Sequence, residues 1–181
     1  RQMSEGSLAL HTESANDQHY EVPAGFFESM LGQRLKYSCS YYESEETTLD
    51  SAETAMLDLT VRRAGLVDGM DILELGCGWG SLTLYMAERF PASNIKAVSN
   101  SNNQREFIEA RAGSHGLSNI QVVTSDINEY RTSDVFHRVI SIEMFEHLRN
   151  YHLLFELTAD WLKADGRLFF HIFCHRNSPY F

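Results

Sequence analysis

A short apolar run that ends in three glycines is the feature of this sequence that most constrains its fold. Residues 72–81 read Ile-Leu-Glu-Leu-Gly-Cys-Gly-Trp-Gly-Ser, with a glycine at every second position from Gly76 to Gly80. Each glycine lacks a Cβ atom and tolerates positive φ, so the backbone can approach a ligand closely. A helical pattern follows, and the first turn of a helix has free N–H groups. We therefore expect a strand, a ligand-binding loop and a helix, with a nucleoside as the ligand.

The sequence after this loop alternates between strand and helix patterns. Buried strands separated by helices of ten or more residues are typical of a parallel sheet with helices on both faces. The predicted fold class is therefore α/β, with a Rossmann-like architecture and a mostly parallel sheet. Strands are predicted over 71–75, 95–99, 120–124, 137–142 and 167–173, and helices over 80–89, 102–113 and 150–163.

The segment before the glycine loop is predicted to be an N-terminal arm and accessory lid over 1–49, ahead of a nucleoside-binding domain over 50–181. Residues 1–18 are polar and without periodicity, which is typical of a mobile arm that leads into a short helix near Phe26 to Leu31. A longer helix is predicted over 50–64, where Asp50 and Glu53 have the spacing of a capping box. Because the sequence starts without Met and ends soon after an apolar strand, we expect a fragment whose C-terminal strands are missing.

Charge and cysteine content narrow the partners and the compartment. A net charge of −10 opposes attraction to nucleic acid, so no nucleic-acid partner is predicted. The 3 cysteines are odd in number and far apart, which suits free thiols in a reducing compartment and predicts a cytoplasmic protein. No apolar run approaches the roughly 18 residues of a membrane span, so any membrane contact would be peripheral.

The residues around the glycines argue against a dinucleotide-binding loop and against a P-loop. In a dinucleotide fold the third glycine would come one residue later, and a carboxylate would follow the second strand to hold the ribose. Here residues 99–104 read Ser-Asn-Ser-Asn-Asn-Gln, with hydroxyls and amides in that place. A P-loop would need a lysine after the glycines, and there is none.

Five segments in order resemble the class I S-adenosylmethionine-dependent methyltransferases. The resemblance is to the cyclopropane fatty acid synthase-like branch, which also contains the coclaurine N-methyltransferase-like enzymes. The glycine loop alone would fit any class I methyltransferase, whereas Tyr-Ser-Cys at 37–39 and Phe-Glu-His at 145–147 narrow the resemblance to this branch. It extends from about Gln18 to Phe181 and implies S-adenosylmethionine as the cofactor. The matching segments are residues 37–42, 73–81, 99–104, 141–147 and 170–173.

The resemblance also implies which residues contact the cofactor. The glycines would lie beneath its methionine part, an amide and a hydroxyl would take the ribose, and the end of the third strand would meet the adenine. Asp126 has an alternative interpretation as a helix N-cap. The implied cofactor-binding residues, from the methionine end to the adenine, are Tyr37, Ser38, Gly76, Gly78, Gly80, Gln104, Ser99, Ser125, Asp126 and Ile127.

At the reacting centre the resemblance implies two chemistries for the catalytic residues Cys39, Glu146, His147 and His171. In cyclopropane synthase-like enzymes the positions of Cys39, Glu146 and His171 hold a bicarbonate ion that removes a proton as the ring closes. A further tyrosine of that family would lie beyond Phe181. In the amine-methylating relatives, Glu146 and His147 would orient or deprotonate the substrate amine.

Three neighbouring features are interpreted as structural. Glu143 is taken as a carboxylate at a helix start, where the dipole favours it, and Trp79 as a packing residue. No metal site is predicted, because strand alternation would place His171 and His175 on one face and Cys174 on the other, without a fourth ligand.

The leading functional prediction is therefore methyl transfer to an unsaturated phospholipid acyl chain. The presence of Cys39, Glu146 and His171 together favours this chemistry. The alternative is N-methylation of a small amine. A second alternative is a non-catalytic module that binds a nucleoside or a partner protein.

Overall fold

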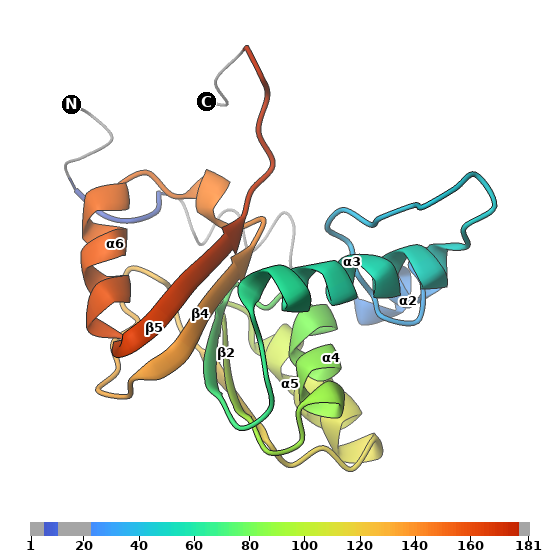
Figure 1. Cartoon of the computed structure of the whole chain (residues 1–181), viewed down its shortest axis with the longest axis horizontal. Helices are drawn as coiled ribbons and strands as arrows, with labels where there is room; N and C mark the ends of the chain where they lie inside the picture. Colours follow the sequence, from blue (N-terminus) through green and yellow to red (C-terminus); the bar gives the residue numbers. More distant parts are fainter. Residues whose placement is uncertain (1–5, 11–22, 178–181) are drawn as a thin grey trace.

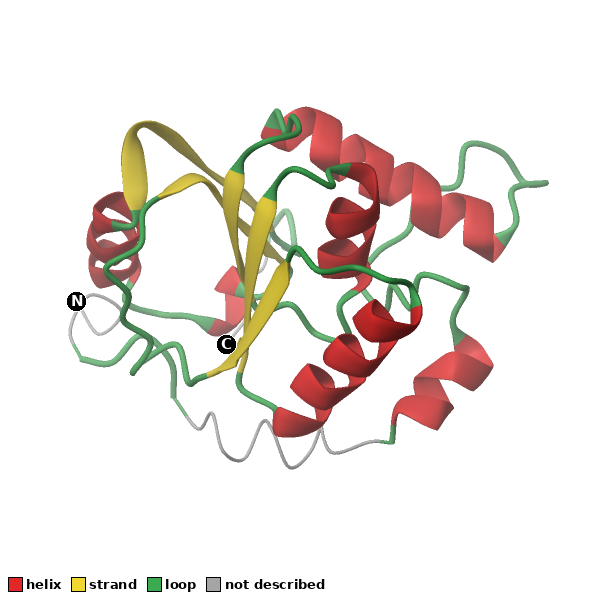
Figure 2. Ribbon diagram, turned by 90° about the horizontal axis from the view of Figure 1, so that it is seen from below, coloured by secondary structure: helices red, strands yellow, loops and turns green. Residues whose placement is uncertain are grey.

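The protein is built on a five-stranded sheet whose neighbouring strands are all parallel. The computed structural model describes residues 6–10 and 23–177. The strand order is β3-β2-β1-β4-β5, and Figures 1 and 2 show helices on both sides of the sheet. The predicted α/β fold with a parallel sheet is thus confirmed. The strands are β1 (Asp71–Leu75), β2 (Asn94–Ser99), β3 (Ile120–Thr124), β4 (Phe136–Ile142) and β5 (Leu162–His171).

Each face of the sheet is covered by its own apolar core, because successive side chains of a strand point to opposite faces. Ile72 of β1 and Ile140 of β4 pack in a cluster with residues of α3 and α4. Leu73 and Val139, one residue along each strand, pack in a second cluster with α6. The helices are α2 (Ala24–Met30), α3 (Leu49–Ala64), α4 (Ser81–Arg89), α5 (Asn102–Ser114), the 3-10 turn η2 (Phe145–His147) and α6 (Tyr151–Asp160).

The strand order reverses direction between β1 and β4, and this determines where a ligand can bind. From β1 the chain adds β2 and β3 on one side and then returns to place β4 on the other side of β1. The crossovers therefore diverge at the carboxyl ends of β1 and β4, which opens a crevice there. The glycine loop follows β1, and Glu143 to His147 follow β4, so both segments lie at this crevice.

The boundary between α6 and β5 differs from the sequence prediction. The predicted helix over 150–163 ends at Asp160, and the strand predicted over 167–173 runs from Leu162 to His171. Trp161 is buried with its ring against Tyr130, and Leu162 already pairs with Phe136 of β4. Pairing with β4 therefore outweighs the helical pattern, and a register irregularity near Phe136 accommodates the early start.

The start of α3 is also capped differently from the prediction. The N-cap is Thr48, whose side chain accepts a hydrogen bond from the Ser51 N–H. The carboxylates of Asp50 and Glu53 instead reach backwards to the preceding loop. Glu53 is fully buried and accepts hydrogen bonds from three backbone N–H groups, those of Gly32, Arg34 and Lys36. The predicted capping box is thus wrong, and the two acids hold the accessory segment onto the helix.

The described part of the N-terminal arm is anchored, contrary to the prediction of a mobile segment. Leu8 is 1% exposed and packs in the core on the α6 side of the sheet. Its carbonyl accepts a hydrogen bond from the Arg149 N–H, and Ala9 exchanges two hydrogen bonds with the side chain of Asn128. The rest of the predicted arm, residues 1–5 and 11–18, lies outside the described residues.

Two further predictions concern cysteines and the membrane. Cys39, Cys77 and Cys174 are all free thiols, as expected from their number and spacing. Within residues 6–10 and 23–177, no helix has the length and apolar character that a bilayer crossing requires.

Candidate functional site

The glycine loop has a backbone shape that side chains would not fit. Gly76, Gly78 and Gly80 have φ values of 75°, 53° and 80°. A Cβ atom on Gly76 would lie 2.9 Å from the Met144 side chain, and one on Gly78 would lie 2.8 Å from the Tyr37 ring. Tyr37, which precedes α3 in the chain, therefore lies directly over the loop.

Gly80 differs from the other two glycines. It lines neither of the cavities described below, and a Cβ atom there would lie 2.6 Å from Ile108 of α5. Gly80 is also the N-cap residue of α4. It therefore allows α4 and α5 to pack closely rather than facing a ligand.

Two cavities adjoin at Tyr37 and the glycine loop. They measure about 360 Å³ and about 90 Å³ and share five wall residues: Tyr37, Gly76, Gly78, Ile142 and Glu143. The larger cavity also contacts Lys36, Ser38, Glu74, Glu146 and His147. The smaller one is lined by Ser99, Gln104, Ser125, Asp126 and Ile127. With the exception of Gly80, every predicted cofactor residue lines one of the two cavities.

The smaller cavity has the polar groups that a ribose needs. The Ser99 hydroxyl donates a 2.6 Å hydrogen bond to Gln104 Oε1 in a buried position. This leaves Gln104 Nε2 as a buried donor that has no partner among the described residues. Such a donor is costly unless something satisfies it, and a ribose hydroxyl would do so.

Asp126 caps a turn and also lines the smaller cavity. Its Oδ1 accepts a 2.7 Å hydrogen bond from the Asn128 N–H, so it caps the turn that follows β3. The residue also lines the smaller cavity together with Ile127, whose side chain is buried.

Glu143 is a candidate site residue to which the sequence prediction assigned only a structural role. No helix begins at this position, since only the short turn η2 follows from Phe145, so its interpretation as a helix-start carboxylate is wrong. Glu143 has a φ of 50°, uncommon for a residue with a side chain, and its N–H donates to the His171 carbonyl over 2.7 Å. Its carboxylate accepts a hydrogen bond from the Cys39 N–H. Its place just after β4, at the carboxyl edge of a parallel sheet, was the available signal.

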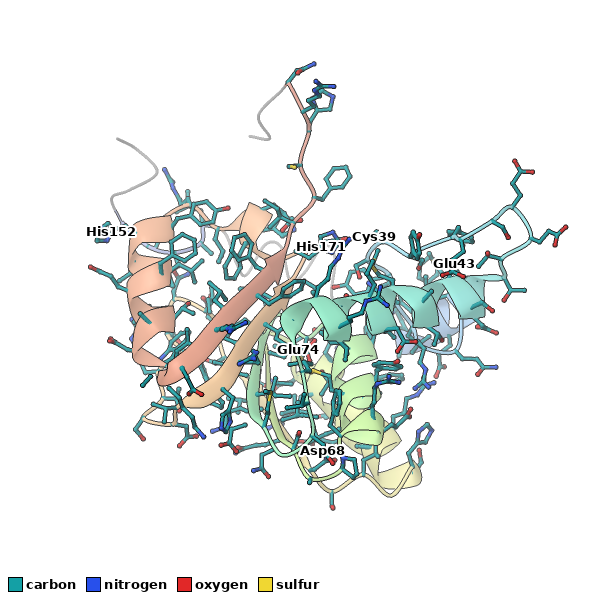
Figure 3. All side chains as sticks on the ribbon, viewed as in Figure 1. Cys39, Glu43, Asp68, Glu74, His152 and His171 are labelled. Carbon is teal, nitrogen blue, oxygen red and sulfur yellow. The ribbon has the colours of Figure 1, made fainter. Side chains whose placement is uncertain are left out.

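Cys39 and His171 meet across the site, as expected. Their Sγ and Nε2 atoms are 3.9 Å apart, and Figure 3 shows the two side chains facing each other where the accessory segment passes the end of β5. The third member of this group is Glu143, because ligand atoms of the three residues all lie within 4.8 Å of one another. Desolvation and the adjacent Glu143 carboxylate raise the pKa of the Cys39 thiol, so it is a neutral thiol at pH 7 rather than a thiolate nucleophile.

Glu146 is held separately from this group. Its Oε1 accepts a 2.9 Å hydrogen bond from the Phe173 N–H, while Oε2 is buried and has no partner among the described residues. The free oxygen belongs to a residue that lines the larger cavity, next to His147.

A cysteine, a carboxylate and a histidine at this separation form a set that can hold a divalent metal such as zinc. Strand alternation, on which the prediction of no metal site was based, does not extend to Cys174 and His175, because β5 ends at His171.

Trp79 packs as predicted. It is 3% exposed, and its ring lies 5.4 Å from that of Phe27 and 5.3 Å from that of Phe107, measured between centroids. It thereby joins α2 and α5 to the glycine loop.

Glu74 is a second carboxylate that the sequence reasoning did not use. It lies on β1, fully buried, and accepts a 2.6 Å hydrogen bond from Thr83. Burial raises its pKa to about 7, with Thr83 and Lys36 acting in the opposite direction. Glu74 also lines the larger cavity, and Figure 3 labels its position.

This raised pKa predicts a specific pH dependence of stability. Between the unfolded value near 4.5 and the folded value of about 7, the unfolded state is ionised while the folded state stays neutral, so stability falls as pH rises through this window. Glu74→Gln keeps an acceptor for Thr83 and removes the titration. We expect it to raise the free energy of unfolding by about 3 kcal/mol at pH 8 and by less than about 1 kcal/mol at pH 5.

Urea denaturation at the two pH values measures this difference. Glu45→Gln, at an exposed position, is the matched control and should have no effect at either pH. Equal stabilisation by Glu74→Gln at both values would show that Glu74 does not titrate in this range.

Comparison with known proteins places this geometry in a family. A family model described as mycolic acid cyclopropane synthetase matches residues 9–179. The chain belongs to the mycolic acid cyclopropane synthetase family. Members of this family fold as class I S-adenosylmethionine-dependent methyltransferases, in agreement with the resemblance recognised from the sequence.

The chain is similar in sequence to relatives with two different activities. The chain is 43% identical over 173 residues to an (S)-coclaurine N-methyltransferase of Thalictrum flavum subsp. glaucum, which covers 96% of this chain and 48% of the relative. It is 31% identical over 156 residues to cyclopropane mycolic acid synthase 1 of Mycobacterium tuberculosis, covering 84% of this chain and 53% of that protein. The chain thus spans about half the length of the curated relatives it matches.

One solved structure is especially similar. A coclaurine N-methyltransferase bound to N-methylheliamine and SAH superimposes with a TM-score of 0.91 at 40% identity, covering 94% of this chain and 49% of that one. The chain is therefore more similar to these two N-methyltransferases than to the cyclopropane synthase of Mycobacterium tuberculosis.

Proposed function

We propose that this chain forms the cofactor-binding part of an S-adenosylmethionine-dependent N-methyltransferase that acts on a small amine. The observation that carries the proposal is the pair of adjoining cavities at the crevice between β1 and β4. One has ribose-binding groups, and the other is lined by Glu74, Glu143 and Glu146. The two share Tyr37 and the glycine loop, so a cofactor could bridge them.

The residues present fit the proposed cofactor. The unsatisfied Gln104 Nε2 and the Ser99 hydroxyl suit a ribose, and Ile127 offers an apolar surface for a base. Tyr37 and Met144 pack so close to Gly78 and Gly76 that Cβ atoms there would clash with them, so these two side chains meet the loop where it lines both cavities. When bound, the cofactor supplies an electrophilic methyl group, and the protein must align a nucleophile with it.

The acidic lining suits an amine as that nucleophile. An aliphatic amine with a pKa near that of lysine, about 10.4, is a cation at neutral pH and is attracted to carboxylates. It must also lose a proton before its lone pair can attack, and a carboxylate or histidine within hydrogen-bond reach can accept that proton. Glu143, Glu146 and His147 all line the cavity where the amine would lie.

The same lining argues against the cyclopropane chemistry that the sequence favoured. A bicarbonate ion held by Cys39 and His171 would lie beside the Glu143 carboxylate, whose ligand oxygen is within 4.8 Å of both residues. Two anions placed side by side repel each other. The preference for a phospholipid substrate is therefore reversed, and the coclaurine N-methyltransferases among the relatives support the alternative. A cytoplasmic location and the absence of a nucleic-acid partner stay predictions from composition.

Isotope transfer tests the proposal. The protein is incubated with S-adenosylmethionine carrying a CD₃ group, together with coclaurine or with vesicles of a cis-unsaturated phospholipid. We expect the amine to gain an intact CD₃ group and the lipid to stay unlabelled. A lipid that gains a CD₂ unit, having lost one deuterium to ring closure, would support the cyclopropane chemistry instead. Binding of SAH without label in either substrate would support the non-catalytic module.

A further inference from the structure

Lys36 is a buried cation in the larger cavity that neither the sequence motifs nor the proposed chemistry explains. Its side chain is 5% exposed, and the residue forms part of the cavity wall beside Ser38 and Glu74. Its ammonium donates a 2.5 Å hydrogen bond to the Ser38 hydroxyl. An ammonium group has three donors, so this single bond leaves capacity for another ligand.

Lys36 carries a buried positive charge that has no ion-pair partner among the described residues. Lys36 is the one lysine or arginine among the described residues that line this cavity, against the carboxylates Glu74, Glu143 and Glu146. It forms none of the ion pairs found within residues 6–10 and 23–177. Burial lowers its pKa, while the nearby carboxylates oppose that shift. A buried charge without a close counter-ion is costly, and an anionic ligand group would relieve that cost.

The polarity of the two cavities indicates which anionic group this is. The ribose-binding residues lie in the smaller cavity. A ligand with its nucleoside there can extend its other end into the larger cavity, because the two cavities share Tyr37 and the glycine loop as walls. For S-adenosylmethionine that other end is an amino acid, with one carboxylate and one ammonium group. Lys36 is the one lysine or arginine among the described residues of that cavity wall, so it is the cation available to the carboxylate.

We propose that Lys36, together with Ser38, binds the carboxylate of the cofactor's methionine end. The proposal rests on the function proposed above and adds to it a residue that selects cofactors with an intact amino acid. The backbone of Lys36 is held in place by Glu53. The Lys36 N–H is one of the three backbone donors to that carboxylate, with 3.4 Å between the Lys36 nitrogen and Glu53 Oε1.

Calorimetry with two nucleosides tests this assignment. SAH has the carboxylate, whereas 5′-methylthioadenosine has the same nucleoside and a thioether but no amino acid. A hydrogen bond to a charged group contributes about 1.5–3 kcal/mol, so Lys36→Met should weaken SAH binding by about tenfold to a hundredfold. Its affinity for 5′-methylthioadenosine should be unchanged. Lys96→Met, which removes a lysine paired with Asp134 outside both cavities, should change neither affinity.

The outcomes separate this inference from the function on which it rests. Wild-type protein that binds neither nucleoside would overturn the proposed function. Wild-type binding of both, with Lys36→Met weakening both equally or neither, would overturn the role of Lys36 and leave the function intact. If Lys36→Met does not fold, Lys36→Gln retains a donor for Ser38 without the charge and should give the same selective loss for SAH.

Discussion

Glu143→Gln is expected to lower the rate of amine methylation by about 10²-fold to 10⁴-fold, the usual range for a group that handles a proton. The substitution keeps the size of the side chain and an acceptor for the Cys39 N–H, but it removes the charge. A neutral amide would neither attract an ammonium substrate nor accept its proton. The measurement is single-turnover transfer of the labelled methyl group to the amine, with SAH affinity measured by calorimetry alongside.

Controls for this variant come from other glutamates of the chain. Glu109→Gln, on the exposed surface of α5, should leave the rate unchanged. Glu146→Gln tests the second carboxylate of the cavity, which gives one oxygen to the Phe173 N–H and retains a free one. A wild-type rate in Glu143→Gln would remove this residue from the chemistry, even if its strained backbone conformation had suggested a functional role.

Glu53→Gln is expected to destabilise the protein by about 3 kcal/mol and to loosen the segment that closes over the glycine loop. The amide would place N–H donors against backbone donors that the carboxylate now accepts from, and an unsatisfied buried donor costs about 1–3 kcal/mol. Those donors belong to Gly32, Arg34 and Lys36, just before Tyr37 and Ser38. We therefore expect weaker SAH binding as well as lower stability.

Hydrogen exchange resolves where the effect of Glu53→Gln occurs. The amides of residues 32, 34 and 36 should exchange faster, while those of β1 and β4 should change little beyond the global loss of stability. Asp50→Asn is the matched comparison, since Asp50 accepts one such bond, from Gln33, in an exposed position. It should cost less than about 1 kcal/mol. Uniform acceleration across the sheet in Glu53→Gln would contradict a local anchoring role.

Much of the fold could be predicted because local pattern and tertiary packing agree along most of the chain. The strands over β1, β2 and β3 are short apolar runs in the sequence, and the glycines and Pro91 between them mark the turns. Predictions failed where a distant partner decided the outcome. Trp161 leaves a helical pattern because its neighbour Leu162 pairs with Phe136, and Leu8 is buried by contacts with residues more than a hundred positions away.

The residues of the candidate site also differ in whether local sequence or distant contacts determine their roles. The glycines, Gln104 and Asp126 each lie in a segment that is recognisable locally in the sequence, so they could be predicted, and all but Gly80 line a cavity. The roles of Glu53, Glu143 and Lys36 depend on which side chains the fold brings together from α3, the accessory segment and the end of β4. A carboxylate near the start of a helix, or one just after a strand, has an ordinary structural explanation. Only its three-dimensional partners distinguish the unusual cases.

The return of the chain from β3 to the far side of β1 has a consequence for folding during synthesis. As the chain leaves the ribosome, β1, β2 and β3 can pair in order, each with the strand made just before it. The edge of β1 that will face β4 stays open until residues 136–142 emerge, more than sixty residues after β1. The contact between Cys39 and His171 forms later still, because the two residues are 132 positions apart in the sequence. Contacts this distant in sequence form slowly, because the loop between them must close first. The strands that carry the proposed nucleoside site should therefore pair before β4 and β5 are made, and a nucleoside bound there would stabilise the nascent sheet during that interval.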